Sequence, residues 1–84
     1  MNHIQVIHQL ARRVRVIAPA LRRDAEKALL VEILLRKHDA IRKVRVVPEL
    51  GSVAVHFDPR RLPPDNVLRL LDTVIGNIAQ APRR

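Results

Sequence analysis

In some stretches of the chain apolar and polar residues alternate with period two, and in others the apolar residues recur every three or four positions, as on one face of a helix. Alternation over residues 4–10 and 13–17 predicts two strand segments, with a bulge or bend at residues 11–12 between them. Pro19 ends the second segment, because proline cannot donate to a sheet ladder. Residues 21–37 are rich in strong helix formers and predict the first helix. The core face of this helix is expected to consist of Leu21, Ala25, Ala28, Val31 and Leu35.

The second half of the chain repeats this change of spacing. Residues 41–47 and 52–57 alternate again and are separated by a turn that ends in Gly51, which predicts a hairpin. A second helix is expected from Pro63 to about residue 79, since proline is tolerated in a first turn. The order β-α-β-β-α predicts an α+β, ferredoxin-like split βαβ fold with a short or missing fourth strand. Two helices should cover one face of an antiparallel sheet.

Length, composition and charge narrow the class of protein. The 84 residues predict a single domain, with an ordered core over residues 4–79 and a frayed tail at 80–84. The chain has no cysteine, which excludes disulfides and thiolate chemistry. Its net charge of +8 indicates an acidic partner, such as nucleic acid, an anionic membrane surface or an acidic protein face. No apolar run approaches a membrane span and no signal-peptide pattern is present, so we expect the cytoplasm or the cytosolic face of a membrane protein.

Three segments carry a resemblance to a known family: residues 8–16 (HQLARRVRV), 39–46 (DAIRKVRV) and 47–59 (VPELGSVAVHFDP). Over roughly residues 6–78 the chain resembles the heavy-metal-associated domain family. It is most similar to the cysteine-free branch found at the N-terminus of some metal-transporting P-type ATPases. The resemblance implies a ferredoxin-like fold and a setting in metal transport or homeostasis.

The resemblance also draws attention to a missing metal site. The family usually carries CxxC at the turn between its first strand and first helix, and the corresponding positions here are Leu21 and Asp24. Neither residue supplies a thiolate for a soft metal. The family's fourth strand, which follows the second helix and flanks the first strand, is also missing. Either residues 4–10 fill that edge of the sheet, or the edge pairs with another copy of the chain.

Histidines offer the only other metal ligands that the sequence suggests. None of the four histidines forms a close helical pair, and solvated or structural roles are the default interpretation. A composite site of His8 and His56 on adjacent strands is the weak alternative. We therefore expect no metal and no cofactor.

Basic residues form the candidate binding surface. The face opposite the helices is expected to carry Arg13, Arg15, Lys43 and Arg45 together with His56, and the missing metal turn carries Arg22 and Arg23. The face has no aromatic side chain on which a base could stack, because Phe57 is the chain's single aromatic residue and points the other way. Nucleic-acid binding through charge alone would be weak and sensitive to salt.

The first helix has more apolar residues than one core face needs. Leu30, Ile33 and Leu34 predict self-association or docking, unless a long helix buries them in its own core. The sequence has no catalytic constellation and no glycine-rich phosphate loop, so we expect no enzyme. The favoured interpretation is a non-catalytic, heavy-metal-associated-like domain that acts through protein–protein or self-association contacts. It would be a regulatory or docking domain of a P-type ATPase or a stand-alone relative. The alternatives are a basic nucleic-acid-binding module and a histidine-based metal binder.

Overall fold

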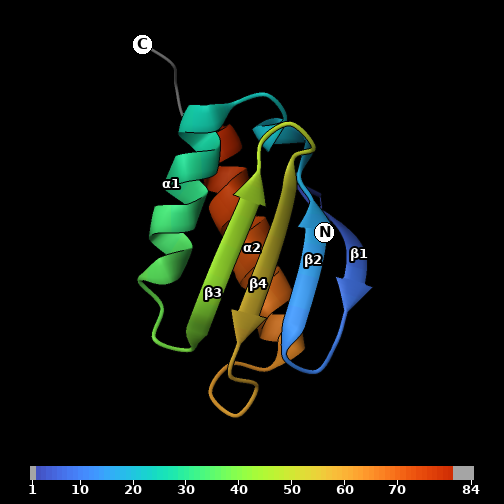
Figure 1. Cartoon of the computed structure of the whole chain (residues 1–84), viewed down its shortest axis with the longest axis vertical. Coiled ribbons are helices and arrows are strands. Elements are labelled where there is room, and N and C mark those ends of the chain that lie inside the picture. The colour runs from blue at the N-terminus through green and yellow to red at the C-terminus, as the bar shows by residue number, and fades with distance from the viewer. Residues whose placement is uncertain (1, 81–84) are drawn as a thin grey trace.

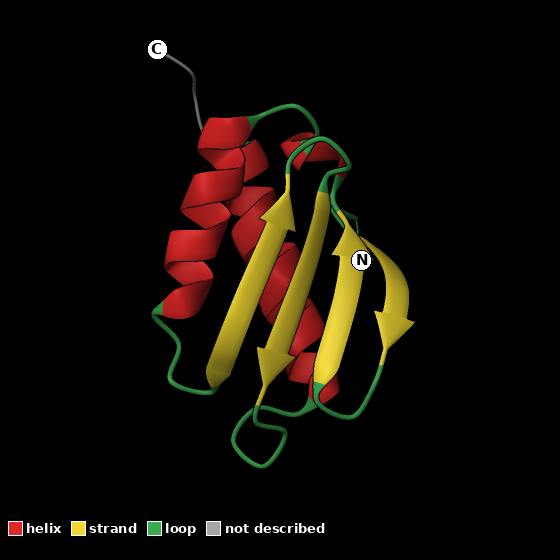
Figure 2. Cartoon of the chain, in the orientation of Figure 1, coloured by secondary structure: helices red, strands yellow, loops and turns green. Residues whose placement is uncertain are grey.

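The computed structural model describes residues 2–80, which form one layer of sheet and one layer of helices (Figure 1). In chain order the elements are β1 (Gln5–Gln9), β2 (Arg13–Ile17), the short 3-10 helix η1 (Pro19–Leu21), α1 (Ala25–Arg36), β3 (Ile41–Val47), β4 (Ser52–Phe57) and α2 (Pro64–Ala79). The sheet is antiparallel in the order β1-β2-β4-β3, and both helices cover the same face (Figure 2). The predicted α+β, ferredoxin-like arrangement is confirmed. Apart from Gln80, the tail predicted at 80–84 lies outside the described residues.

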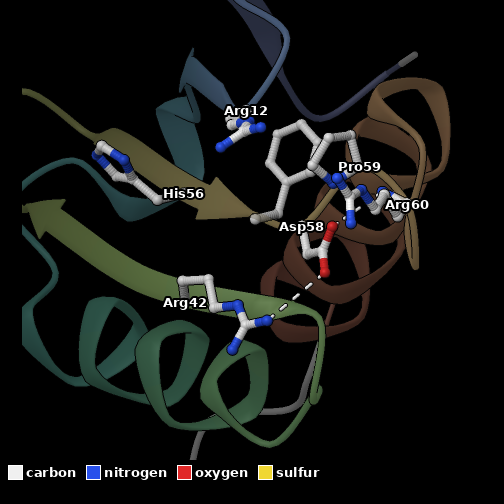
Figure 3. A pocket seen from close by; sticks show the side chains of 7 residues that line it. Arg12, Arg42, His56, Asp58, Pro59 and Arg60 are labelled. Atoms are coloured by element: carbon white, nitrogen blue, oxygen red, sulfur yellow. Dashed lines mark hydrogen bonds and ion pairs between the residues drawn. The ribbon is translucent and has the colours of Figure 1, made fainter.

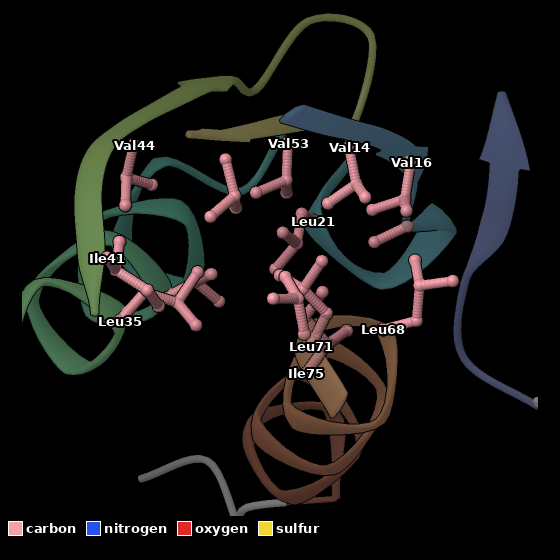
Figure 4. Packing of buried hydrophobic residues seen from close by; sticks show 14 of the residues in the cluster. Val14, Val16, Leu21, Leu35, Ile41, Val44, Val53, Leu68, Leu71 and Ile75 are labelled. Carbon is pink, nitrogen blue, oxygen red and sulfur yellow. The ribbon is translucent and has the colours of Figure 1, made fainter. Parts of the chain in front are cut away.

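β1 fills the sheet edge that the missing fourth strand would have occupied. It runs antiparallel to β2, with Val6 opposite Val16 and His8 opposite Arg15. Of the two alternatives for this edge, pairing within the chain is therefore the one found. The register shifts between Val6 and His8, which leaves Ile7 as a bulge. All five residues of β1 are exposed, and the strand lies to one side of the buried cluster (Figure 4).

The residues before β1 tie this strand to α2. The backbone N–H of His3 donates to the Asp72 carboxylate at 2.9 Å. The His3 ring lies against Gly76, where an added Cβ would come within 2.6 Å of the ring. Ile4 packs against the core. These contacts hold the start of an otherwise exposed strand, and no periodic pattern in the sequence predicted them.

The core lies between the helices and the inward face of the sheet (Figure 4). Alternation along the strands decides which residues enter it, since Val14 and Val16 are fully buried whereas Arg13 and Arg15, which alternate with them, reach solvent. The strands and η1 contribute Val14, Val16, Leu21, Ile41, Val44, Val53, Val55 and Phe57, and the helices contribute Val31, Leu35, Val67, Leu68, Leu71, Ile75 and Ile78.

α1 begins four residues later than the sequence predicted. Pro19–Leu21 forms a 3-10 helix, and Arg23 has a φ of 57°, a left-handed conformation that an α-helix cannot pass through. Asp24 then caps α1 by accepting the Lys27 backbone N–H at 3.1 Å. Leu21 consequently reaches the core from η1, and Ala25 is exposed rather than part of the core face.

The outer side of α1 is apolar. Leu29, Leu30, Ile33 and Leu34 are each 43–56% exposed, and they lie opposite the buried side chains of the same helix. The alternative that the longer helix buries Leu30, Ile33 and Leu34 in its own core is therefore wrong. Of the helices between residues 2 and 80, none has the length and apolar character needed to cross a membrane.

Candidate docking surface

The open face of the sheet, opposite the helices, gathers basic side chains in two rows. Four come from two strands that are not neighbours: Arg13 and Arg15 of β2, and Lys43 and Arg45 of β3. His56 of β4 lies between Arg13 and Lys43 in the first row, and Ala54 lies between Arg15 and Arg45 in the second. Two strand spacings put the two columns of cations about 10 Å apart.

No carboxylate neutralises these four cations within the described part of the chain. The ion pairs found between residues 2 and 80 involve other basic residues. The Arg13 Nε is buried and has no hydrogen-bond partner there. Arg13, Arg15 and Arg45 line a groove of about 300 Å³ that also contacts the small residues Ser52 and Ala54. A buried donor without a partner costs about 1–3 kcal/mol, so an acceptor that entered this groove would be stabilised.

A second hollow lies at the end of the sheet where β2 and β3 begin and β4 ends. It has a volume of about 440 Å³ and is lined by Arg12, Arg42, His56, Phe57, Asp58, Pro59 and Arg60 (Figure 3). The Asp58 carboxylate lies 3.5 Å from the Arg42 guanidinium and accepts the Arg60 backbone N–H at 3.0 Å. Sequence reasoning missed this hollow, which we call the end pocket. The available signal was an arginine within three residues of each of these strand ends, namely Arg12, Arg42 and Arg60.

Together these seven cations, the four on the sheet and the three of the end pocket, form what we call the cationic face. Between residues 2 and 80 the chain has 14 Lys and Arg and eight Asp and Glu. The cationic face holds seven of the cations and one of the acids, Asp58. The other seven cations are matched by seven acids. The whole net charge of residues 2–80, +6, is therefore carried by the cationic face.

The turn that lacks cysteines is closed by structural contacts. Leu21 is fully buried, and Asp24 caps α1 and lies 3.8 Å from the Lys27 ammonium. The Ala18 backbone N–H donates to the Gly51 carbonyl at 2.7 Å, and the Arg23 N–H donates to the Pro48 carbonyl at 2.7 Å. Both positions that the resemblance aligns with metal-binding cysteines thus have structural roles.

Arg22 and Arg23 do not join the cationic face at the end pocket. Both are exposed, but they follow the far end of β2, whereas Arg12 precedes its start (Figure 1). The sequence grouped them with the sheet residues as one basic surface. The structure places them beside the β3–β4 turn, where the Arg23 backbone N–H donates to the Pro48 carbonyl, at the opposite end of the sheet from the end pocket.

The histidines are dispersed. His8 and His56 do not lie on adjacent strands, as the sequence analysis proposed, because β2 runs between β1 and β4. His8 lies opposite Arg15 and His56 opposite Arg13, so a metal ion between them would meet two guanidiniums. His38 instead accepts the Ala40 backbone N–H through its Nδ1 at 3.2 Å. In the described range no three His, Asp or Glu residues gather as a metal site would require.

Comparisons with known proteins find similarity to one region of metal-exporting P-type ATPases. No family model matches the chain, and no solved structure matches it. The manganese-exporting P-type ATPase of Mycobacterium tuberculosis (strain H37Rv) is 36% identical over 58 residues, which is 69% of this chain and 8% of that protein. The zinc-exporting P-type ATPase of Mycobacterium marinum is 39% identical over 56 residues, which is 67% of this chain and 8% of that protein. The chain spans about 8% of the length of these relatives and is similar to one region of metal-exporting P-type ATPases.

Proposed function

We propose that the chain is a non-catalytic, heavy-metal-associated-like domain that serves metal transport by docking onto an acidic protein surface through its cationic face. The observation that carries this proposal is the charge distribution: seven cations and one acid lie on one face of an otherwise neutral domain. Similarity to a region of manganese- and zinc-exporting P-type ATPases supports the metal-transport setting. The domain would work on the cytoplasmic side, either as a regulatory part of an exporter or as a separate subunit.

The closed turn supports docking rather than carriage of metal. Leu21 fills the core and Asp24 caps a helix, so the two positions that would bear thiolates are committed to stability. The end of the domain that presents metal in this family would then offer Arg22 and Arg23 as a further contact for acidic groups.

The apolar side of α1 would supply a second contact. Leu30, Ile33 and Leu34 are exposed on the helix, and burial of such side chains contributes about 1.5–3 kcal/mol each when complete. Self-association or docking through this side of α1 is compatible with a free cationic face, which lies on the open side of the sheet.

A charge-reversal experiment tests the main proposal. The double variant Arg15→Glu, Arg45→Glu would reverse the charge in the middle of the cationic face. The substitutions would be made in the host's own gene, so that the full protein containing this chain is tested. The matched control is Arg36→Glu with Arg69→Glu, which makes the same charge change on the exposed sides of the two helices. Far-UV circular dichroism of the purified variants checks that each folds.

The readout is growth of the host in raised manganese or zinc. We expect the face variant to lose metal tolerance and the control to keep it. Equal tolerance of the two variants would refute docking through this face, and unchanged tolerance after complete deletion would remove the metal-transport role.

Nucleic-acid binding is the first alternative, favoured by the same cationic face. Phe57, the chain's single aromatic residue, is 3% exposed and packs in the core. A nucleic acid would therefore lack base stacking worth about 1–3 kcal/mol per base. A salt-dependent mobility shift with DNA or RNA at physiological ionic strength would favour this alternative over protein docking.

A histidine-based metal site is the second alternative. Calorimetric titration with zinc, copper and nickel decides it, because a site requires a saturable, stoichiometric heat. The separation of His8 from His56 by β2 predicts that none will be measured.

A further inference from the structure

We propose that the end pocket binds a phosphate group, either inorganic phosphate or the terminal phosphate of a monoester. This site is distinct from the groove between Arg15 and Arg45, and the inference does not rest on the docking function. It rests on the position, charge and shape of the residues in Figure 3.

Three arginines line the pocket from three separate segments. Arg12 comes from the β1–β2 loop, Arg42 from the start of β3, and Arg60 from the β4–α2 loop. Figure 3 shows Arg12 and Arg42 on opposite sides of the hollow, with His56 on a third side. The segments meet because β2 and β3 begin, and β4 ends, at the same edge of the antiparallel sheet.

A bulge places Arg42 at this site. The pairing of β3 with β4 shifts register between Ile41 and Lys43, so Arg42 has no direct partner in the ladder. Lys43 points outward and Val44 is buried. Strict alternation would therefore direct the side chain of residue 42 toward the helices, like that of Val44. The bulge instead exposes the side chain, which is 62% accessible and lines the pocket.

The charge of the pocket fits a dianion. Three guanidiniums and the Asp58 carboxylate leave a net charge of +2 with His56 neutral. A phosphate monoester carries about −1.5 to −2 near neutral pH. A planar carboxylate is satisfied by the fork of one arginine, whereas guanidiniums on several sides can surround a tetrahedral group. The volume of about 440 Å³ leaves room for a phosphate and part of the molecule that bears it.

Asp58 acts as an internal competitor for that anion. Its Oδ2 lies 3.5 Å from Arg42 Nη2, beyond an ideal charge-assisted hydrogen bond, and both side chains are partly open to solvent. Its Oδ1 accepts the Arg60 backbone N–H and fixes the turn. A phosphate would therefore compete with a weak contact to Arg42, while the turn that orients Arg60 is kept.

Titration with inorganic phosphate at constant ionic strength, followed by amide chemical shifts, tests the site. We expect saturable shifts for the amides of residues 12, 56, 57, 58 and 60, with the amides of α1 unmoved. Sodium acetate at the same ionic strength is the comparison and should give smaller shifts that do not saturate. Shifts that are linear in phosphate, or equal shifts with acetate, would overturn the proposal.

Two substitutions sharpen the test. Arg12→Ala should weaken phosphate binding about 10-fold, the low end for loss of a charge-assisted hydrogen bond. Arg15→Ala removes the same charge from the same face outside the pocket and should change binding less than about 2-fold. Equal weakening by the two variants would show a diffuse charge effect and overturn the assignment.

Removal of the internal competitor should tighten binding. Asp58→Asn keeps an oxygen that can accept the Arg60 N–H but removes the negative charge, and binding should improve between about 3- and 10-fold. Weaker binding by a folded Asp58→Asn variant would overturn the proposal. If this variant does not fold, the comparison of Arg12→Ala with Arg15→Ala decides. Failure of the phosphate site would leave the docking test intact, because that test alters Arg15 and Arg45 only.

Discussion

The closed turn makes a specific prediction about restoring the missing cysteines. In the double variant Leu21→Cys, Asp24→Cys, the family's CxxC spacing returns at the positions that the resemblance assigns. We expect this variant to lose stability and to gain no tight metal site, because Leu21 points into the core and Asp24 caps α1. A thiol at position 21 would be buried rather than exposed to a metal.

The magnitude follows from those two roles. Truncation of a buried leucine to alanine costs about 2–5 kcal/mol, and a cysteine keeps part of the volume, so we take about 2–3 kcal/mol for Leu21. Loss of an N-cap costs about 1 kcal/mol, and the Asp24–Lys27 ion pair at 3.8 Å adds little. The sum of about 3–4 kcal/mol compares with a total stability of about 4–13 kcal/mol for a domain of this size. The thermal midpoint should fall by roughly 12–32 °C.

Far-UV circular dichroism is the suitable probe, because the chain has no Trp and no Tyr for fluorescence. Urea and thermal unfolding would be measured with a reductant present, first with a chelator and then with copper(I) or zinc in place of the chelator, for both single variants and the double variant. Arg22→Cys is the matched control, since it adds a thiol to the same turn at an exposed position. A double variant whose free energy of unfolding is within about 1 kcal/mol of the parent's would refute the reasoning. So would a double variant whose thermal midpoint, after addition of copper(I) or zinc, exceeds that of the parent.

Three further variants test other parts of the structure. Gly51→Ala should cost at least about 1–2 kcal/mol in urea unfolding, since Gly51 has a φ of 67° and the new Cβ would lie 2.7 Å from the Ala18 carbonyl oxygen. Gly76→Ala should change stability by less than about 1 kcal/mol, because its Cβ meets only the movable His3 ring and alanine favours the helix; a loss as large as that at Gly51 would contradict this. Replacement of Leu30, Ile33 and Leu34 by serine should abolish any increase of the apparent mass with concentration in sedimentation velocity. A parent chain that is monomeric at high concentration would contradict the self-association hypothesis.

Local patterns predicted most of the fold. Residues 41–47 and 52–57 form strands with the predicted bounds, because side-chain alternation depends only on neighbours along the chain. The start of α1 was wrong by four residues. Helix propensity continues through 21–24, but hydrogen bonds from the turn to Gly51 and Pro48, far along the chain, accompany a non-helical backbone there.

The candidate site divides in the same way. The sequence identified Arg13, Arg15, Lys43 and Arg45, since their positions follow from strand parity. It missed the end pocket, because Arg12 and Arg60 lie in loops and Arg42 lies in a bulge, where no period applies. It also paired His8 with His56, an error that only the strand order exposes.

The sequence by itself determined three features of this protein: the missing cysteines, the excess of arginine, and the alternation that separates core from surface positions. Only the tertiary structure decided that β1 takes the place of the missing strand and that Leu21 and Asp24 close the turn. It also decided that seven cations gather on the open face and at one end of the sheet with a single acid. The physical reason is the distance along the chain over which each interaction acts. Side-chain parity and helix propensity act over a few residues, whereas strand order, turn-to-turn hydrogen bonds and the summed charge of a surface depend on segments distant in the chain.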